Sequence, residues 1–101
     1  MKAYKHLVKY ALANNCVISV YDGEAWDVKQ SSAYKTITDS IESVEEAQLI
    51  IRDSDNAKIG WALVSAFGLE DDETVVDYTT TDFMRSWEST YYPLSTFAIV
   101  E

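Results

Sequence analysis

An Asp-Gly pair at residues 22–23 constrains the fold of this chain more than any other feature of its sequence. It separates a β-branched run at residues 16–21 from a segment in which Trp26 and Val28 alternate with polar residues. Asp-Gly favours the tight turn whose twist matches that of two antiparallel strands, so we expect a β-hairpin here. Strands joined by such a short turn pair in antiparallel fashion, because a parallel pair requires a long crossover connection.

A second hairpin is predicted further along the chain. An apolar segment at residues 49–51 is followed by a polar turn at residues 53–56 and by the apolar run 59–64. The turn begins like a calcium-binding loop, which requires alternating oxygen ligands, glycine at the sixth position and glutamate at the twelfth. Lys58 and Val64 occupy those two positions. The segment is therefore predicted to be a hydrogen-bonded turn rather than a metal site.

Three helices are predicted from apolar residues that recur at intervals of three and four. The first covers residues 2–13. The second covers residues 33–44 and follows Ser31-Ser32, a pair of residue types that cap helices well. The third follows several candidate caps at residues 77–81 and ends before Pro93, which cannot continue a helix.

Two shorter segments complete the predicted fold. Residues 74–76 are expected to form a short strand, and residues 96–100 form either a last edge strand or a docked extended segment. The order is α-β-β-α-β-β-(β)-α-(β), which indicates an α+β fold with helices on one face of an antiparallel sheet. A chain of 101 residues with 48% hydrophobic content can bury one core, so residues 1–101 are predicted to form a single domain.

The charge of the chain is distributed unevenly. Lys2, Lys5 and Lys9 lie in the first predicted helix, which has no acidic residue, whereas acidic residues give the whole chain a net charge of −9. Nucleic acids and anionic membranes require neutralising Lys or Arg side chains, so we expect neither to bind. A basic protein is the partner that such a surface attracts, and simple solubility is the alternative interpretation. The predicted partner contacts are Glu42, Glu45, Glu46, Glu70, Asp71, Asp72, Glu73 and Trp26.

The sequence offers no recognisable catalytic or metal-binding set, and we expect no enzyme activity and no cofactor. Its only histidine and its only cysteine are His6 and Cys16. Cys16 opens an apolar run and is predicted to be buried, whereas His6 is predicted to face solvent beside the lysines. Four adjacent acids at residues 70–73 point in different directions and are expected to form an exposed loop rather than a cation site. With no apolar segment of about 20 residues and no signal-peptide pattern, a cytoplasmic location is expected.

The aromatic residues leave a second function open. Trp61 lies in an apolar run and is expected in the core, whereas Trp26 and the pair Tyr91-Tyr92 are candidates for exposure. If the acidity serves only solubility, the chain could be a structural or scaffold-like module that forms a homodimer. Its interface would then be the aromatic third helix or the C-terminal strand, and replacing Trp87 or Phe97 would weaken the dimer.

The run at residues 17–26, together with Ser31, residues 59–61 and residues 74–78, resembles a group of small uncharacterised bacteriophage proteins. The resemblance extends from the first helix through Tyr78. It implies a phage origin, the host cytoplasm and the helix-hairpin order, and it brings no catalytic residues. Small acidic phage proteins often neutralise host enzymes, some by imitating DNA. The uracil-DNA glycosylase inhibitors share the acidity and the helix-plus-antiparallel-sheet plan, although no motif here assigns the chain to them. The resulting hypothesis is a phage-encoded protein that modulates or inhibits a basic, nucleic-acid-binding host protein.

Overall fold

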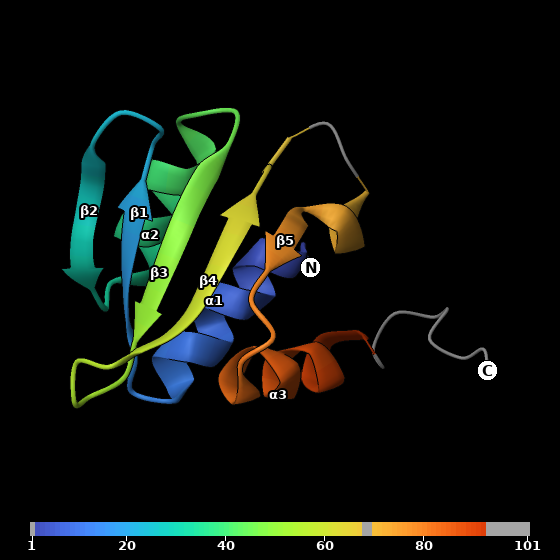
Figure 1. The fold of residues 1–101 in the computed structure, drawn as a ribbon. Helices are drawn as coiled ribbons and strands as arrows, with labels where there is room; N and C mark the ends of the chain where they lie inside the picture. Colours follow the sequence, from blue (N-terminus) through green and yellow to red (C-terminus); the bar gives the residue numbers. More distant parts are fainter. Residues whose placement is uncertain (1, 68–69, 93–101) are drawn as a thin grey trace.

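A five-stranded antiparallel sheet with the strand order β2-β1-β3-β4-β5 forms the centre of the fold (Figure 1). The computed structural model describes residues 2–67 and 70–92. The α+β class is confirmed, while the predicted strand at residues 96–100 and the predicted stop at Pro93 lie outside the described residues. The elements are α1 (Ala3–Ala13), β1 (Val17–Tyr21), β2 (Trp26–Ser31), α2 (Tyr34–Glu42), β3 (Ala47–Arg52), β4 (Lys58–Val64), the 3₁₀ turn η1 (Asp71–Glu73), β5 (Val75–Tyr78) and α3 (Asp82–Tyr91).

Both predicted hairpins are confirmed. The first consists of β1 and β2 and the second of β3 and β4, and each pairs in antiparallel fashion. The two hairpins are joined side by side through β1 and β3, which run antiparallel from the pair Val17–Arg52 to the pair Tyr21–Gln48. Strand β5 then adds to the free edge of β4. The sheet is therefore continuous, with β2 and β5 as its two edges.

All three helices pack on one face of this sheet (Figure 1). Alternate residues of β3 and β4 point into the core on that face, as the period of a strand requires. Gly60 allows the close approach of α3, because a Cβ atom there would lie 2.8 Å from Sδ of the buried Met84. The other face carries no helix in the described part of the chain, and we call it the open face. No helix among the described residues is long and apolar enough to cross a membrane.

The start of α2 differs from its prediction. The N-cap of α2 is Ala33, not one of the two serines, and an alanine side chain has no acceptor for the free N–H groups of the helix. Ser31 is still part of β2, where it pairs with Ile18, and its Oγ accepts a hydrogen bond from the N–H of Ala33 at 3.0 Å. The serine hydroxyl therefore turns the chain out of the strand rather than capping the helix. In α3, by contrast, Thr81 is the N-cap and accepts a hydrogen bond from the N–H of Met84.

Two of the predictions for aromatic residues are wrong. Trp61 is only half-buried on the open face, where its Nε1–H donates to Oε1 of Gln48 at 3.1 Å. The alternation of β4 explains this, because Gly60 and Ala62 take the inward positions on either side of it. Tyr91 is buried rather than exposed.

The aromatic face of α3 packs against the core of the fold. Trp87 is fully buried between α1 and the sheet, and its ring stacks on Tyr91 with the ring centroids 5.8 Å apart. Tyr10 of α1 packs on Phe83 of α3. Trp87 therefore has no exposed surface with which to form a homodimer interface, and Phe97 lies outside the described residues.

His6 does not simply face solvent, as the sequence predicted. Its Nδ1 accepts a hydrogen bond from Nε1–H of Trp87 at 3.2 Å, and its ring packs on Tyr91. The imidazole must be unprotonated at Nδ1 to accept this bond. Burial lowers the pKa of His6, and nearby positive charges that include Lys9 lower it further. Cys16 is buried as predicted, and burial raises the pKa of its thiol.

The depressed pKa of His6 predicts a loss of stability in mild acid. The unfolded chain has the higher histidine pKa and binds the proton more readily, so this contribution is present above the ordinary value of 6.5 and is lost as the pH falls below it. Urea unfolding of the wild type and of His6→Gln at pH 7 and pH 5 measures the effect. The wild type should lose more stability than the variant, which cannot titrate there. Equal losses would show that protonation of His6 is not coupled to folding.

Candidate partner-binding site

Three connections meet at one end of the sheet, and together they carry eight acidic residues. Strands β1 and β4 end at this end of the sheet, and β2, β3 and β5 begin there, as the antiparallel register requires. The connections cover residues 22–25, 43–46 and 65–74, and their sequences contain no Lys or Arg. The connections at the opposite end contribute only two acids, Asp53 and Asp55. We call the first set the acidic end; its acids are Asp22, Glu24, Glu45, Glu46, Glu70, Asp71, Asp72 and Glu73.

A hollow of about 380 Å³ lies within the acidic end, between two of its connections. Glu45 and Glu46 line it from the α2–β3 connection, and Ser65 and Phe67 line it from the chain that leaves β4. Both glutamates are exposed, and Phe67 has 54% of its surface exposed. Nζ of Lys2 lies 5.8 Å from the centre of the Phe67 ring, so this ring already attracts one cation of its own chain. The hollow combines two exposed carboxylates with an aromatic face.

The acidic segment at residues 70–73 is held in place by Thr74, which is fully buried. The Thr74 hydroxyl donates to the carbonyl of Asp71 at 3.1 Å and accepts a hydrogen bond from the N–H of Tyr4 at 3.1 Å. Its backbone carbonyl accepts a hydrogen bond from the N–H of Ser65. The phenol of Tyr92 donates to the carbonyl of Asp72 at 3.2 Å. Three of these acids therefore lie on the 3₁₀ turn Asp71–Glu73, with Glu70 at its N-cap, and hydrogen bonds hold this turn against the rest of the fold.

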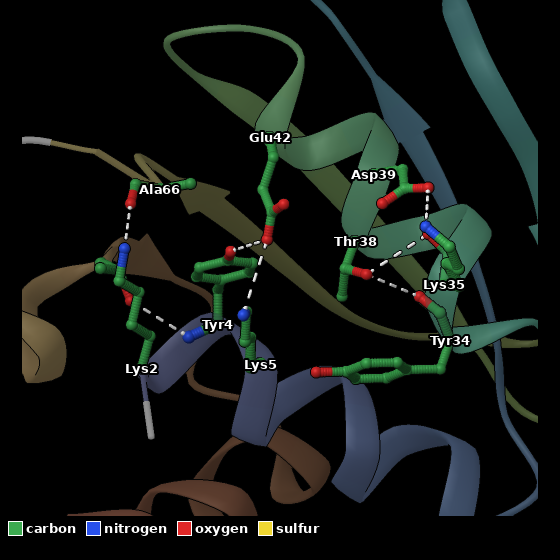
Figure 2. Close-up of polar contacts among 10 residues, drawn as sticks. Lys2, Tyr4, Lys5, Tyr34, Lys35, Thr38, Asp39, Glu42 and Ala66 are labelled. Carbon is green, nitrogen blue, oxygen red and sulfur yellow. Dashed lines mark hydrogen bonds and ion pairs between the residues drawn. The ribbon is translucent and has the colours of Figure 1, made fainter.

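Glu42 lies at the end of α2 beside this site, but its carboxylate has partners within the chain. Figure 2 shows the phenol of Tyr4 donating to Glu42 Oε2, with Lys5 Nζ 3.8 Å from the same oxygen. The pKa of Tyr4 is raised by burial and by this carboxylate, so the phenol keeps its proton and remains a donor. Lys2 also approaches the acidic end, where its Nζ donates to the carbonyl of Ala66 (Figure 2). Lys2 and Lys5 thus offset only part of the negative charge at and beside the acidic end.

Two further residues near the first hairpin turn have different roles: Asp22 stabilises the turn, whereas Trp26 is exposed on the open face. Oδ1 of Asp22 accepts hydrogen bonds from the N–H groups of Glu24 and Ala25, and these bonds hold the pKa of Asp22 below its usual value. Asp22 therefore shapes the hairpin turn. Trp26 is 45% exposed and lies on the open face, edge-on to the ring of Tyr21 at a centroid distance of 5.1 Å. The structure thus groups Glu45, Glu46 and residues 70–73 and places Trp26 on a different surface.

The described residues contain no group that could hold a metal ion. Among residues 2–67 and 70–92, no three His, Cys, Asp or Glu side chains gather closely enough to do so. Sequence reasoning missed Phe67, although an aromatic residue placed between an apolar strand and a glycine was a detectable signal. It also missed the burial of Thr74, because a threonine at the start of a short predicted strand, directly after four acids, has no local pattern that marks burial. Comparison of the chain with protein-family models, curated proteins and solved structures found no match.

Proposed function

We propose that this chain is a non-enzymatic interaction protein that binds a basic protein through its acidic end. One observation carries the proposal: eight acids from three separate connections meet at one end of the sheet, and no Lys or Arg lies in those connections. Charge concentrated in this way attracts a positively charged surface over a distance of about 10 Å at ordinary ionic strength. A chain whose acids served solubility alone would have no reason to gather eight of them at one end of its sheet.

The hollow within the acidic end supports the same proposal at the level of single side chains. A Lys or Arg side chain of the partner would place its charge between Glu45 and Glu46 and its stem against Phe67. Carboxylates bind cations by charge-assisted hydrogen bonds, and an aromatic face attracts them further. These three side chains offer both kinds of contact within one hollow.

In its narrower form, the proposal is that the chain is phage-encoded and acts in the host cytoplasm. Its partner would be a host protein with a basic, nucleic-acid-binding site, which the acidic end occupies in place of phosphates. The resemblance of the hairpin and strand motifs to small bacteriophage proteins supports this form. The net charge of −9 supports it too, because a site that binds phosphates is basic and attracts an acidic surface.

Matched charge variants test the proposal. Glu45→Gln, Glu46→Gln and Glu70→Gln together remove three charges from the acidic end. Asp39→Asn, Asp55→Asn and Asp82→Asn remove three exposed charges from elsewhere. Binding of a short fluorescent polylysine is measured by anisotropy at low ionic strength. We expect the first variant to weaken binding about tenfold and the control to weaken it about twofold, because exposed charge contacts contribute little each but add within one surface.

Capture of partners from bacterial lysate, at low and at high salt, extends the test to a natural target. The wild type should retain a basic protein at low salt and release it at high salt, and the acidic-end variant should retain less of it. Equal weakening by the two variants, or a stable homodimer that captures no protein at either salt, would favour solubility and self-association as the role of the chain.

A further inference from the structure

A second hollow, of about 300 Å³, lies on the open face of the sheet beside the edge strand β2. It crosses three strands, because its residues come from β2, β1 and β3. Its volume is at the lower end of the range for small-molecule sites. The residues that line it are Ser19, Trp26, Lys29, Gln30, Ile50 and Arg52.

A bulge in β2 builds this hollow. Ile18 pairs with Ser31 and Val20 pairs with Val28, so that two residues of β2, Lys29 and Gln30, lie opposite Ser19 alone. Neighbouring residues of a regular strand point to opposite faces, yet Lys29 and Gln30 both line the hollow. The bulge therefore directs an additional side chain to the open face, which is a known use of bulges beside binding sites.

The bulge is fixed by a side chain and carries backbone strain. The N–H of Gln30 donates to Oγ of Ser19 at 2.8 Å, which holds the extra residue against β1. Gln30 has a φ of 49°, in the left-handed region that few residues other than glycine adopt. Strain of this kind persists where the surrounding structure holds it, and it is found most often at functional sites.

The charge of the hollow is opposite to that of the whole chain. Its charged residues are Lys29 and Arg52, and no acid lines it in the described part of the chain, whereas the whole chain has a net charge of −9. Within that part, neither cation forms an ion pair with a carboxylate. Nη1 of Arg52 donates to the carbonyl of Asn56 at 3.0 Å, which orients the guanidinium and leaves its other N–H groups for a ligand.

The other side of the hollow is apolar. Trp26 is 45% exposed, and Tyr21 supports its ring from the edge at an interplanar angle of 61°. Ile50 forms the floor beside Ser19, its cross-strand neighbour. A supported indole ring and an aliphatic floor suit a flat apolar group better than a hydrated ion.

We propose that this hollow binds a small organic anion with a flat, apolar body. Lys29 and Arg52 bind its phosphate or carboxylate, and the body lies against Trp26 and Ile50. A nucleotide and an aromatic carboxylate share this chemistry. The site is independent of the acidic end, so failure of one proposal leaves the other intact.

An NMR titration tests the proposal with AMP and with indole-3-acetate as probes. The NMR signals of the indole N–H of Trp26 and the side-chain amide of Gln30 should shift in a saturable manner with at least one probe. The probe that saturates these shifts at the lower concentration shows whether the site prefers a nucleotide or an aromatic carboxylate. Adenosine and inorganic phosphate each lack one half of the ligand. They should require about tenfold higher concentrations.

Two variants and a control test the residues. Lys29→Gln and Arg52→Gln should each weaken the bound probe about tenfold, whereas Lys35→Gln, on the exposed side of α2, should change nothing. Lys29→Gln is the more direct variant, because Arg52 also bonds to its own turn. The proposal is overturned if neither probe gives a saturable shift up to about 10 mM, where even a millimolar ligand saturates. Unchanged binding of the probe to Lys29→Gln would overturn it as well. So would chemical shifts that change with protein concentration when no probe is present, because they would show that the hollow is a contact between two copies of the chain.

Discussion

Replacing Trp87 with alanine is expected to lower the free energy of unfolding by about 3–5 kcal/mol, the usual cost of removing a large aromatic side chain from a core. Trp87 is fully buried, and it contacts the rings of Tyr78, Tyr91 and Tyr92. Its Nε1–H is also the donor to His6. Because a domain of this size has only about 5–15 kcal/mol of stability, the variant should lose a large part of it and unfold at a clearly lower urea concentration.

Urea unfolding followed by circular dichroism measures this loss, and Trp61→Ala is the matched control. Trp61 is the same residue type but lies half-buried on the open face, so its loss should cost less than half as much. Trp87→Phe keeps a six-membered aromatic ring but removes the five-membered ring of the indole, which carries the donor to His6. It should fall between the two. If Trp87→Ala lowered the free energy of unfolding no more than Trp61→Ala does, the packing of α3 against the core would be contradicted.

Replacing Thr74 with valine is expected to cost about 2 kcal/mol, although the two side chains have almost the same shape. The valine cannot accept the hydrogen bond from the N–H of Tyr4, and a buried donor without a partner costs about 1–3 kcal/mol. The change also removes the bond to the carbonyl of Asp71, which shapes the acidic 3₁₀ turn. Binding of a basic partner at the acidic end should therefore weaken along with stability.

Hydrogen exchange at the amide of Tyr4 gives the direct measurement for Thr74. Exchange should become faster in Thr74→Val and stay close to the wild-type rate in Thr74→Ser, which keeps the hydroxyl. Thr36→Val, at an exposed position of α2, is the control for the change of residue type. If Thr74→Ser were as unstable as Thr74→Val, the methyl group rather than the hydroxyl would be the important part of this residue.

The hairpins and helices could be predicted from the sequence because each depends on a local pattern. The Asp-Gly turn, the apolar intervals of the helices and the threonine before α3 all act within a few residues. Patterns of this range cannot show which of two tryptophans is buried. Trp61 lies in the most apolar segment and is only half-buried, whereas Trp87 lies among polar residues and is fully buried in the core. Trp61 points to the open face because its neighbours Gly60 and Ala62 take the inward positions of β4. Trp87 is buried because α3 packs on α1.

The acids of the candidate site were identified in the sequence, but their arrangement was not. Which connections share one end of a sheet depends on the pairing of β1 with β3, a contact between two hairpins that no local pattern encodes. The same limit applies to the bulge at Gln30, because an extra residue in a strand is visible only when its partner strand is known. Trp26 was named as a contact for a basic partner. The structure instead places it beside Lys29 and Arg52.

The contacts of α1 have a consequence for the order of events during synthesis. This helix is translated before the other elements of the fold, but Lys2 at its N-cap has no side-chain acceptor, and the acceptor for the N–H of Tyr4 comes from Thr74. Its apolar face packs on α3, whose residues are translated later still. A helix of 11 residues is marginal by itself in water. α1 is therefore translated before the other described elements but becomes stable only after α3 has been made.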